Sequence, residues 1–250
     1  MKSLSVALFA TTIGLVSLAN AKDMPKSLAL SPAPHPGKEA LHESFNEISK
    51  QGEAELVFLG DSITYGWGKK GKEVWDQQWA PMKAVNFGIG GDRTEHILWR
   101  LQNGNYDGLK PKLTVLMIGT NNTGHQGREM AEHGGVLYNS SAEETAEGVA
   151  AILDTLKEKQ PQMKVLLLAI FPRGADKADP MRQQNEATNQ LIAKLADGKM
   201  VFFLDINQKF LEEDGTLSEE IMPDLLHPNA SGYEIWAKAI KRKVKKLIAE

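Results

Sequence analysis

The sequence contains no cysteine among its 250 residues. This absence excludes disulfide bonds, thiol catalysis and every cysteine-ligated zinc or iron–sulfur site, so any nucleophile must be another side chain. A strong charge of one sign is also lacking, because 29 lysines and arginines stand against 32 aspartates and glutamates, for a net charge of −3. Such a balance does not favour binding of nucleic acid by counterion release, so no nucleic-acid partner is expected.

Long hydrophobic runs are scarce, and the most extended one lies at the N-terminus, from Leu4 to Leu18. Lys2 precedes it and Ala19-Asn20-Ala21 follows it, which is typical of a secretory signal peptide over residues 1–21 with cleavage after Ala21. The run is shorter than the roughly 20 residues of a membrane helix, so an uncleaved anchor is the weaker alternative and no stable membrane anchor is expected. We therefore predict a periplasmic or secreted protein.

The segment 22–37 is rich in proline and predicts an extended leader that either lies on the following domain or hangs free. The segment 38–250 shows no internal repeat, low-complexity tract or second boundary. A hydrophobic content of 42% and this length fit one well-filled domain.

Short apolar segments alternate with amphipathic ones through this domain. The predicted strands are Glu55–Leu59, Ala84–Phe87, Leu113–Ile118, Lys164–Ile170 and Val201–Leu204, and the predicted helices are Glu39–Lys50, Arg93–Gln102, Ala142–Lys159, Pro180–Ala196 and Ser231–Ala249. Apolar strands separated by amphipathic helices indicate an α/β fold with a five-stranded parallel sheet covered on both faces. Such sheets bind ligands at the carboxyl ends of their strands.

Polar residues collect directly after these strands. The blocks are Gly60-Asp61-Ser62 after the first strand, Gly88-Ile89-Gly90-Gly91-Asp92 after the second, Gly119-Thr120-Asn121-Asn122 after the third, and Asp224-Leu225-Leu226-His227 before the last helix. Because the carboxyl ends of parallel strands meet at one edge, we expect all four blocks to lie together.

These blocks contain the groups that acyl transfer needs. Ser62 at a tight turn is a candidate nucleophile, His227 is a candidate general base, and Asp224 can fix the tautomer of that imidazole. The main-chain amides of Ser62 and Gly91 and the side-chain amide of Asn121 are candidate oxyanion donors.

Each block alone has another interpretation. Gly60-Asp61-Ser62 could be only a turn, and Asn121 could merely end a strand. Asp224 and His227 could form a surface cap or a partial metal site. A dinucleotide-binding interpretation of the second block fails, because the third glycine of that motif would fall at Arg93.

Taken together, the four blocks resemble those of the SGNH, or GDSL, hydrolase superfamily, over a range from about Glu55 to Ile240. Several stretches are also similar to the catalytic subunits of intracellular platelet-activating-factor acetylhydrolase. These are Asn86–Asp92, His96–Leu101, Asn103-Gly104, Gly119–Asn122, Pro172–Gly174 and Arg182-Gln183-x-Asn185.

The resemblance implies a flavodoxin-like three-layer α/β/α sandwich with no cofactor and no metal. It also implies Ser62 as the nucleophile, Gly91 and Asn121 as oxyanion donors beside the Ser62 amide, and Asp224 with His227 as the rest of a triad. The signal peptide and the polar segment 124–140 depart from the acetylhydrolase pattern.

Four further residues are candidates for substrate binding. Tyr65 and Trp67 follow the nucleophile and either line the pocket or pack the first helix, and Arg173 either approaches the cleft or forms a structural salt bridge. His125 lies in the segment 124–140, whose polar side chains suit a hydroxyl-rich leaving group, with a solvent-exposed spacer as the alternative. Two histidines in this segment lack a third ligand, so no metal site is expected there.

We predict a secreted serine esterase that removes short acyl groups, with acetyl as the expected one, from a polar alcohol such as a carbohydrate, through an acyl-enzyme. The expected partner is a small-molecule or polysaccharide ester. One alternative is a lysophospholipase or thioesterase acting on longer acyl chains. Another is a non-catalytic carbohydrate-binding protein on the same fold.

Overall fold

The computed structural model describes residues 27–250, so the predicted signal peptide and residues 22–26 lie outside the described part of the chain. Its central sheet has five parallel strands in the order β2 (Ala84–Gly88), β1 (Leu56–Gly60), β3 (Leu113–Met117), β6 (Lys164–Leu168) and β7 (Val201–Leu204). The predicted parallel sheet is confirmed, with each strand within two residues of its expected ends.

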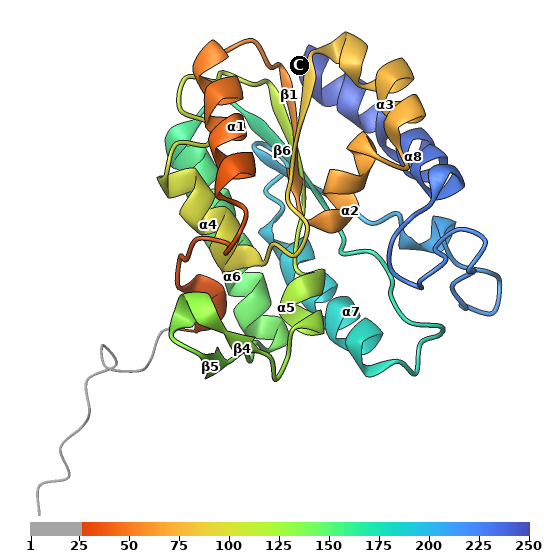
Figure 1. The fold of residues 1–250 in the computed structure, drawn as a ribbon. Helices are drawn as coiled ribbons and strands as arrows, with labels where there is room; N and C mark the ends of the chain where they lie inside the picture. The colour runs from red at the N-terminus through yellow and green to blue at the C-terminus, as the bar shows by residue number, and fades with distance from the viewer. Residues whose placement is uncertain (1–26) are drawn as a thin grey trace, which may run out of the picture.

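Helices cover both faces of this sheet (Figure 1). One face carries α1 (Glu39–Gln51), α4 (Thr94–Gln102), α6 (Ala142–Lys159) and α7 (Pro180–Ile192), and the other carries α2 (Ser62–Tyr65), α3 (Lys72–Gln78) and α8 (Ala230–Ala249). The α/β/α sandwich is therefore confirmed.

Two hydrophobic clusters, one on each face, hold the layers together. Successive residues of β1 point to opposite faces, so Val57 and Leu59 join one cluster while Leu56 and Phe58 join the other. All five residues of β1 are buried, as expected for a strand in the middle of a covered parallel sheet.

The chain adds strands to one side of β1 first and then to the other side. The chain passes from β1 to its neighbour β2 on one side and then crosses to β3 on the other side, so the crevice between the carboxyl ends of β1 and β3 is a topological switch point. Ser62 follows β1 and Asn121 follows β3, which places both at this crevice.

Several short elements were not predicted. They are α2, α3, α5 (Thr120–Gly124), and a hairpin of β4 (Glu129–Met130) and β5 (Val136–Leu137) within the segment 124–140. Each is too short to show a periodic hydrophobic pattern in the sequence. The helix predicted to reach Ala196 ends as an α-helix at Ile192 and continues as a 3₁₀ turn over Ala193–Leu195.

The described part of the proline-rich leader, Ser27–Gly37, lies on the domain, which is one of the two expected alternatives. Ala29 and Ala33 are buried, and Thr94 Oγ1 at the start of α4 donates a hydrogen bond of 2.8 Å to the carbonyl of Ala29. We call this segment the strap. Within residues 27–250, no helix has both the length and the apolar character needed to cross a membrane.

Candidate active site

Ser62 is the first residue of α2, at the sharp turn that follows β1. Asp61 caps this short helix, because its carboxylate accepts a hydrogen bond of 2.9 Å from the amide of Ile63. Gly60 is needed before the turn, since a Cβ there would collide with the carbonyl oxygen of Met117 on β3. The hydroxyl of Tyr233 on α8 donates to the Ile63 carbonyl at 2.6 Å and ties the turn to the helix beneath it.

The structure brings Ser62, His227 and Asp224 into one chain of hydrogen bonds. Ser62 Oγ lies 2.8 Å from His227 Nε2, and His227 Nδ1 lies 2.6 Å from Asp224 Oδ2. Because a carboxylate only accepts, Nδ1 carries the proton and Nε2 is left to accept the serine hydroxyl. This geometry can transfer a proton from Ser62 to His227.

The loop that holds Asp224 and His227 is shaped by its own backbone. Asp224 Oδ1 accepts a hydrogen bond of 2.7 Å from the main-chain amide of His227, and Leu225 between them has a left-handed φ of 56°. The Leu225 carbonyl accepts from the amide of Gly174 at 2.9 Å, which anchors the loop to the segment after β6. Partial burial acts to raise the pKa of Asp224, but the hydrogen bonds from His227 outweigh it and lower this pKa.

The oxyanion candidates lie across the crevice from this loop. Gly91 has a left-handed φ of 88°, a conformation that favours glycine. Asn121 lies in the first turn of α5, and its Nδ2 donates to the carbonyl of Asp92 at 2.9 Å. This bond uses one of the two amide hydrogens, so the other is available to an oxyanion. We call Gly88–Arg93 the oxyanion loop.

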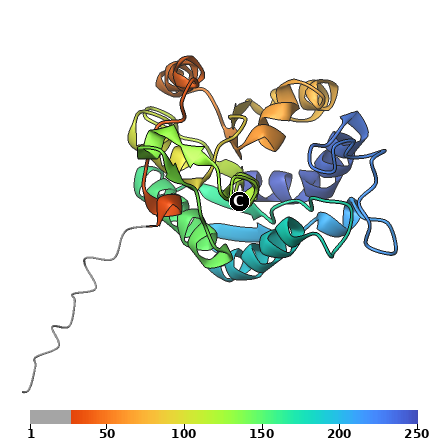
Figure 2. The same cartoon turned by 60° about the horizontal axis from the view of Figure 1, so that its bottom comes forward.

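Figure 2 brings the carboxyl edge of the sheet towards the viewer. The strap and the hairpin of β4 and β5 lie on one side of this edge, and the blue loops that lead into α8 lie on the other. We call the loop of Asp224 and His227 one half of the candidate site, and the oxyanion loop with Asn121 the other half. Separate parts of the chain therefore support the two halves.

A buried carboxylate, Asp92, anchors the oxyanion loop. Its two oxygens accept hydrogen bonds from Arg100 Nη2 at 2.7 Å and from His35 Nδ1 at 2.8 Å. Burial acts to raise the pKa of Asp92, but the charge of Arg100 together with the contacts of His35 and His96 lowers it below the ordinary value. Arg100 and His96 therefore belong to a buried structural network.

Arg93 fastens the segment 124–140 to the same loop. Its guanidinium binds Glu95 at 2.5 Å, His125 Nδ1 at 2.8 Å and the carboxylate of Glu132, and it stacks over the ring of Tyr138 at 4.5 Å. Burial, followed by the charge of Arg93, lowers the pKa of His125 to about 4, so this ring is neutral near pH 7.

These contacts show that part of the segment 124–140 packs on the domain. His125 and Tyr138 point inward to Arg93, while the choice between a substrate-binding segment and a spacer stays a prediction. The polar side chains that remain exposed are Arg128, Glu129 and Asn139.

The other three candidate binding residues differ in how exposed they are and in what they contact. Trp67 is fully buried among the aromatic rings between the sheet and α8, so the packing alternative replaces the pocket role. Tyr65 is 38% exposed and lies one turn after Ser62. Arg173 Nη1 donates to the carbonyl of Thr120 at 2.7 Å, beside Asn121, so it lies next to the site and forms a structural bond.

One trio of side chains has the composition of a metal site. Ligand atoms of His35, Asp92 and His96 lie within 4.8 Å of one another. However, Asp92 is already bound by Arg100 and His35, and His96 Nδ1 accepts the main-chain amide of Arg93 at 3.1 Å. A guanidinium beside the carboxylate also opposes a second cation, so these residues do not fit a metal ion.

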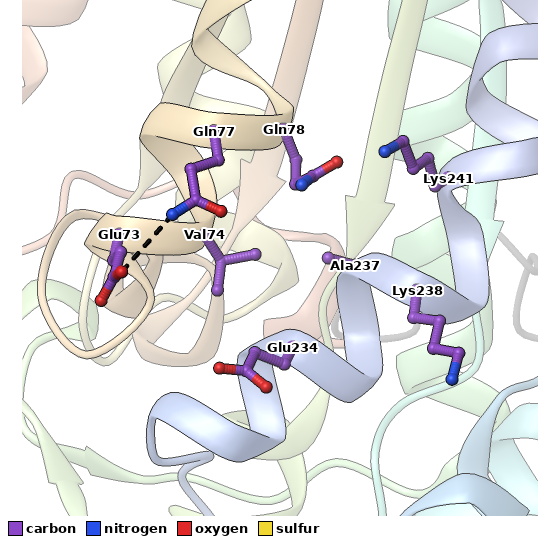
Figure 3. Close-up of a pocket in the computed structure, with 8 residues that line it drawn as sticks. All are labelled: Glu73, Val74, Gln77, Gln78, Glu234, Ala237, Lys238 and Lys241. Atoms are coloured by element: carbon purple, nitrogen blue, oxygen red, sulfur yellow. Dashed lines mark hydrogen bonds between the residues drawn. The ribbon is translucent and has the colours of Figure 1, made fainter.

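A groove between α3 and α8 lies away from this chemistry (Figure 3). It has a volume of about 320 Å³ and is lined by residues such as Glu73, Gln77, Glu234 and Lys238. None of the candidate triad or oxyanion residues lines it.

The family of the chain follows from this arrangement and from its sequence relatives. Residues 58–235 match the GDSL-like lipase/acylhydrolase family, and the chain belongs to that family. The chain is a carboxylic ester hydrolase. It is 37% identical over 212 residues to the alpha1 subunit of human platelet-activating factor acetylhydrolase IB, covering 84% of each chain.

Solved structures share the fold at lower identity. A GDSL-like lipase from Bacteroides thetaiotaomicron is 23% identical, with a TM-score of 0.63 over 83% of this chain and 98% of that one. An acetylxylan esterase from Geobacillus stearothermophilus is 20% identical, with a TM-score of 0.57 over 78% of this chain and 96% of that one.

Sequence reasoning did not find the support of the oxyanion loop. His35 and Asp92 had no assigned function, although a charged group in an oxyanion block is a signal that a partner is needed, since buried charges are paired. Their partners lie too far along the chain for a local pattern to identify them.

Proposed function

We propose that this protein is an exported serine esterase that removes acetyl groups from a carbohydrate through a covalent acyl-enzyme. The observation that carries the chemistry is the hydrogen-bonded series Ser62, His227 and Asp224, with distances of 2.8 and 2.6 Å, at the topological switch point of the sheet.

In the first half of the reaction, Ser62 Oγ attacks the acyl carbonyl carbon while its proton passes to His227 Nε2. The carbonyl oxygen becomes an oxyanion, which the amides of Ser62 and Gly91 and the side chain of Asn121 stabilise. The tetrahedral intermediate then expels the alcohol, which leaves with the proton from His227. Asp224 stabilises the imidazolium throughout.

In the second half, water attacks the acyl-enzyme and His227 accepts its proton. The same donors stabilise the second oxyanion. Collapse of this intermediate returns the proton to Ser62 and releases the carboxylic acid. The net reaction is ester plus water giving acid and alcohol, and it uses only groups of this chain.

Two observations support a short acyl group and a sugar as the leaving alcohol. The human relative is an acetylhydrolase by name. A protein of the same fold is an acetylxylan esterase.

The alternative within the same chemistry is hydrolysis of longer acyl chains, as in a lysophospholipase or thioesterase. Val136 and Leu137 favour it, because these two residues of β5 are 48% and 62% exposed. The non-catalytic binding protein is set aside because the chain is an ester hydrolase with its candidate triad intact.

The test is a comparison of substrates with the protein lacking residues 1–21. We expect kcat/KM for acetate release from acetylated xylooligosaccharides to exceed that for fatty-acid release from lysophosphatidylcholine by at least about tenfold, or about 1.4 kcal/mol. The reverse order would select the longer-chain alternative.

Export has its own test. Expression of the full chain in a bacterial host is expected to deliver a periplasmic or secreted protein whose N-terminal residue is Lys22. A product that retains Met1 in the cytoplasm would contradict this part of the proposal.

A further inference from the structure

The strap reaches the oxyanion loop through one side chain, His35. Its Nδ1 donates to Asp92 Oδ1 at 2.8 Å, and its ring stacks on His96 with a centroid distance of 4.4 Å and an interplanar angle of 22°. The imidazole is 17% exposed, so most of its surface is used in these contacts.

The same ring lies directly against Gly91. A Cβ placed on Gly91 would come within 2.9 Å of His35 Cε1 and 3.3 Å of its Nε2. The left-handed φ of 88° and this close approach both require glycine at the position. The His35 ring therefore packs directly against Gly91, the candidate oxyanion donor.

Asp92 connects the two oxyanion donors that come from different strands. It follows Gly91 in the chain, and its carbonyl accepts the hydrogen bond from the side chain of Asn121 at 2.9 Å. Any movement of Asp92 therefore changes the position of the Gly91 amide relative to the Asn121 amide. Arg100 holds one oxygen of the Asp92 carboxylate, and His35 holds the other.

We propose that His35 is a positioning residue for the oxyanion hole, and that the strap carries this one side chain to the site instead of serving only as a linker after the predicted signal peptide. This proposal rests on the proposed function. His35 acts through Asp92 and Gly91 and does not itself contact the reacting atoms. Its loss removes one donor from a buried carboxylate and opens space beside Gly91, so the loop relaxes.

A relaxed oxyanion loop affects the transition state more than substrate binding, because the negative charge on oxygen develops only there. Displacements near 1 Å in an active site lower rates by up to about 100-fold. For the loss of one of two anchors of Asp92 we expect kcat to fall about tenfold and KM to change less than about twofold.

Three variants of His35 separate the hydrogen bond from packing. His35→Asn keeps an N–H donor close to the position of Nδ1, His35→Phe keeps a ring against Gly91 and His96 without the donor, and His35→Ala removes both. Ser31→Ala is the matched control, because Ser31 Oγ donates to the Ser27 carbonyl within the strap at 3.0 Å. Each variant is assayed with p-nitrophenyl acetate and by thermal unfolding.

We expect His35→Asn and Ser31→Ala to keep kcat within about threefold of the wild type, and His35→Phe and His35→Ala to lose about tenfold in kcat. Wild-type kcat in His35→Phe would overturn the proposal, as would a change confined to KM or an equal loss in His35→Asn. If His35→Ala does not fold, the Asn and Phe variants still decide the question.

The outcome is distinguishable from a failure of the proposed function. An active, folded Ser62→Ala variant would remove the serine mechanism, whatever the His35 variants do. An inactive Ser62→Ala variant together with a fully active His35→Phe variant would leave the serine esterase intact and remove only the role of the strap.

Discussion

The two halves of the candidate site are built in opposite ways. The side chains of His227 and Asp224 are 41% and 57% exposed and lie on a loop. Asp92, Arg93 and His96 across the crevice are at most 3% exposed and belong to a network of buried charges.

This difference fits the tasks of the two halves. A base that gains and loses a proton in each cycle benefits from contact with water, which stabilises its charged form. Oxyanion donors must instead be oriented before the charge develops, and a rigid, desolvated setting strengthens their dipoles. In the proposed mechanism the exposed half transfers the proton and the buried half preorganises the oxyanion donors.

The largest effect is expected at the residue that both halves share. Ser62→Ala should lower kcat by about 10⁴ or more, because the covalent step is lost, and should leave the fold intact since Ser62 is only half-buried. Steady-state kinetics and thermal unfolding measure the two effects. Near wild-type activity in a folded variant would exclude the acyl-enzyme.

The next largest effect tests the buried half alone. Arg93→Met should lower the free energy of unfolding by about 3 to 5 kcal/mol, because Glu95 and Glu132 lose their buried counter-charge. Denaturant titration measures this change.

The matched control for Arg93→Met is Lys72→Met, which breaks an ion pair to Asp76 between side chains that are 64% and 53% exposed. It should change stability little. Equal effects of the two variants would mean that the buried network does not hold the oxyanion side.

A smaller effect on rate is expected at Asn121, and it tests whether this side chain stabilises the oxyanion or only binds substrate. Asn121→Ala should lower kcat about 10²-fold with little change in KM, the usual result of deleting one oxyanion donor. Kinetics with p-nitrophenyl acetate provide the measurement. A change in KM alone would show that Asn121 only binds substrate.

A pH effect is expected at Asp61, which is buried between the two halves and interacts with both Asp92 and His227. Burial raises the pKa of Asp61 from 3.8 to about 7. Between these values the folded state holds a proton that the unfolded state releases, so this group makes stability fall as pH rises from about 4 to about 7.

Asp61→Asn keeps an oxygen to accept the Ile63 amide and removes the ionisation. The variant should therefore lose less stability than the wild type as pH rises through this range. Denaturant titration at several pH values measures the slope, and parallel curves for the two proteins would contradict the raised pKa.

The smallest expected effect is none at all. EDTA should leave both activity and melting temperature unchanged, because the Asp92 carboxylate and His96 Nδ1 already accept hydrogen bonds and Arg100 lies beside them. Inhibition by EDTA that zinc reverses would instead assign a metal to this trio.

The sequence determined the sheet, the sandwich and the edge at which Ser62, Asn121 and His227 collect. Hydrophobic periodicity is a local property, and the carboxyl ends of parallel strands necessarily meet, so the three polar blocks that follow strands could be assigned to one rim before any contact was known. The fourth block was assigned to the same rim as part of an adjoining loop. The capping box of Ser141 and Glu144 was predictable for the same reason, since its hydrogen bonds join residues three apart.

Only the tertiary structure decided which way the remaining side chains point. Trp67 faces the core, His125 turns inward to Arg93, and His35 from the leader seats the oxyanion loop. The physical reason is that a buried polar group must find a partner wherever the chain brings one. His35 and Asp92 are 57 residues apart, and Arg93 and Glu132 are 39 apart, so no local pattern records these pairs.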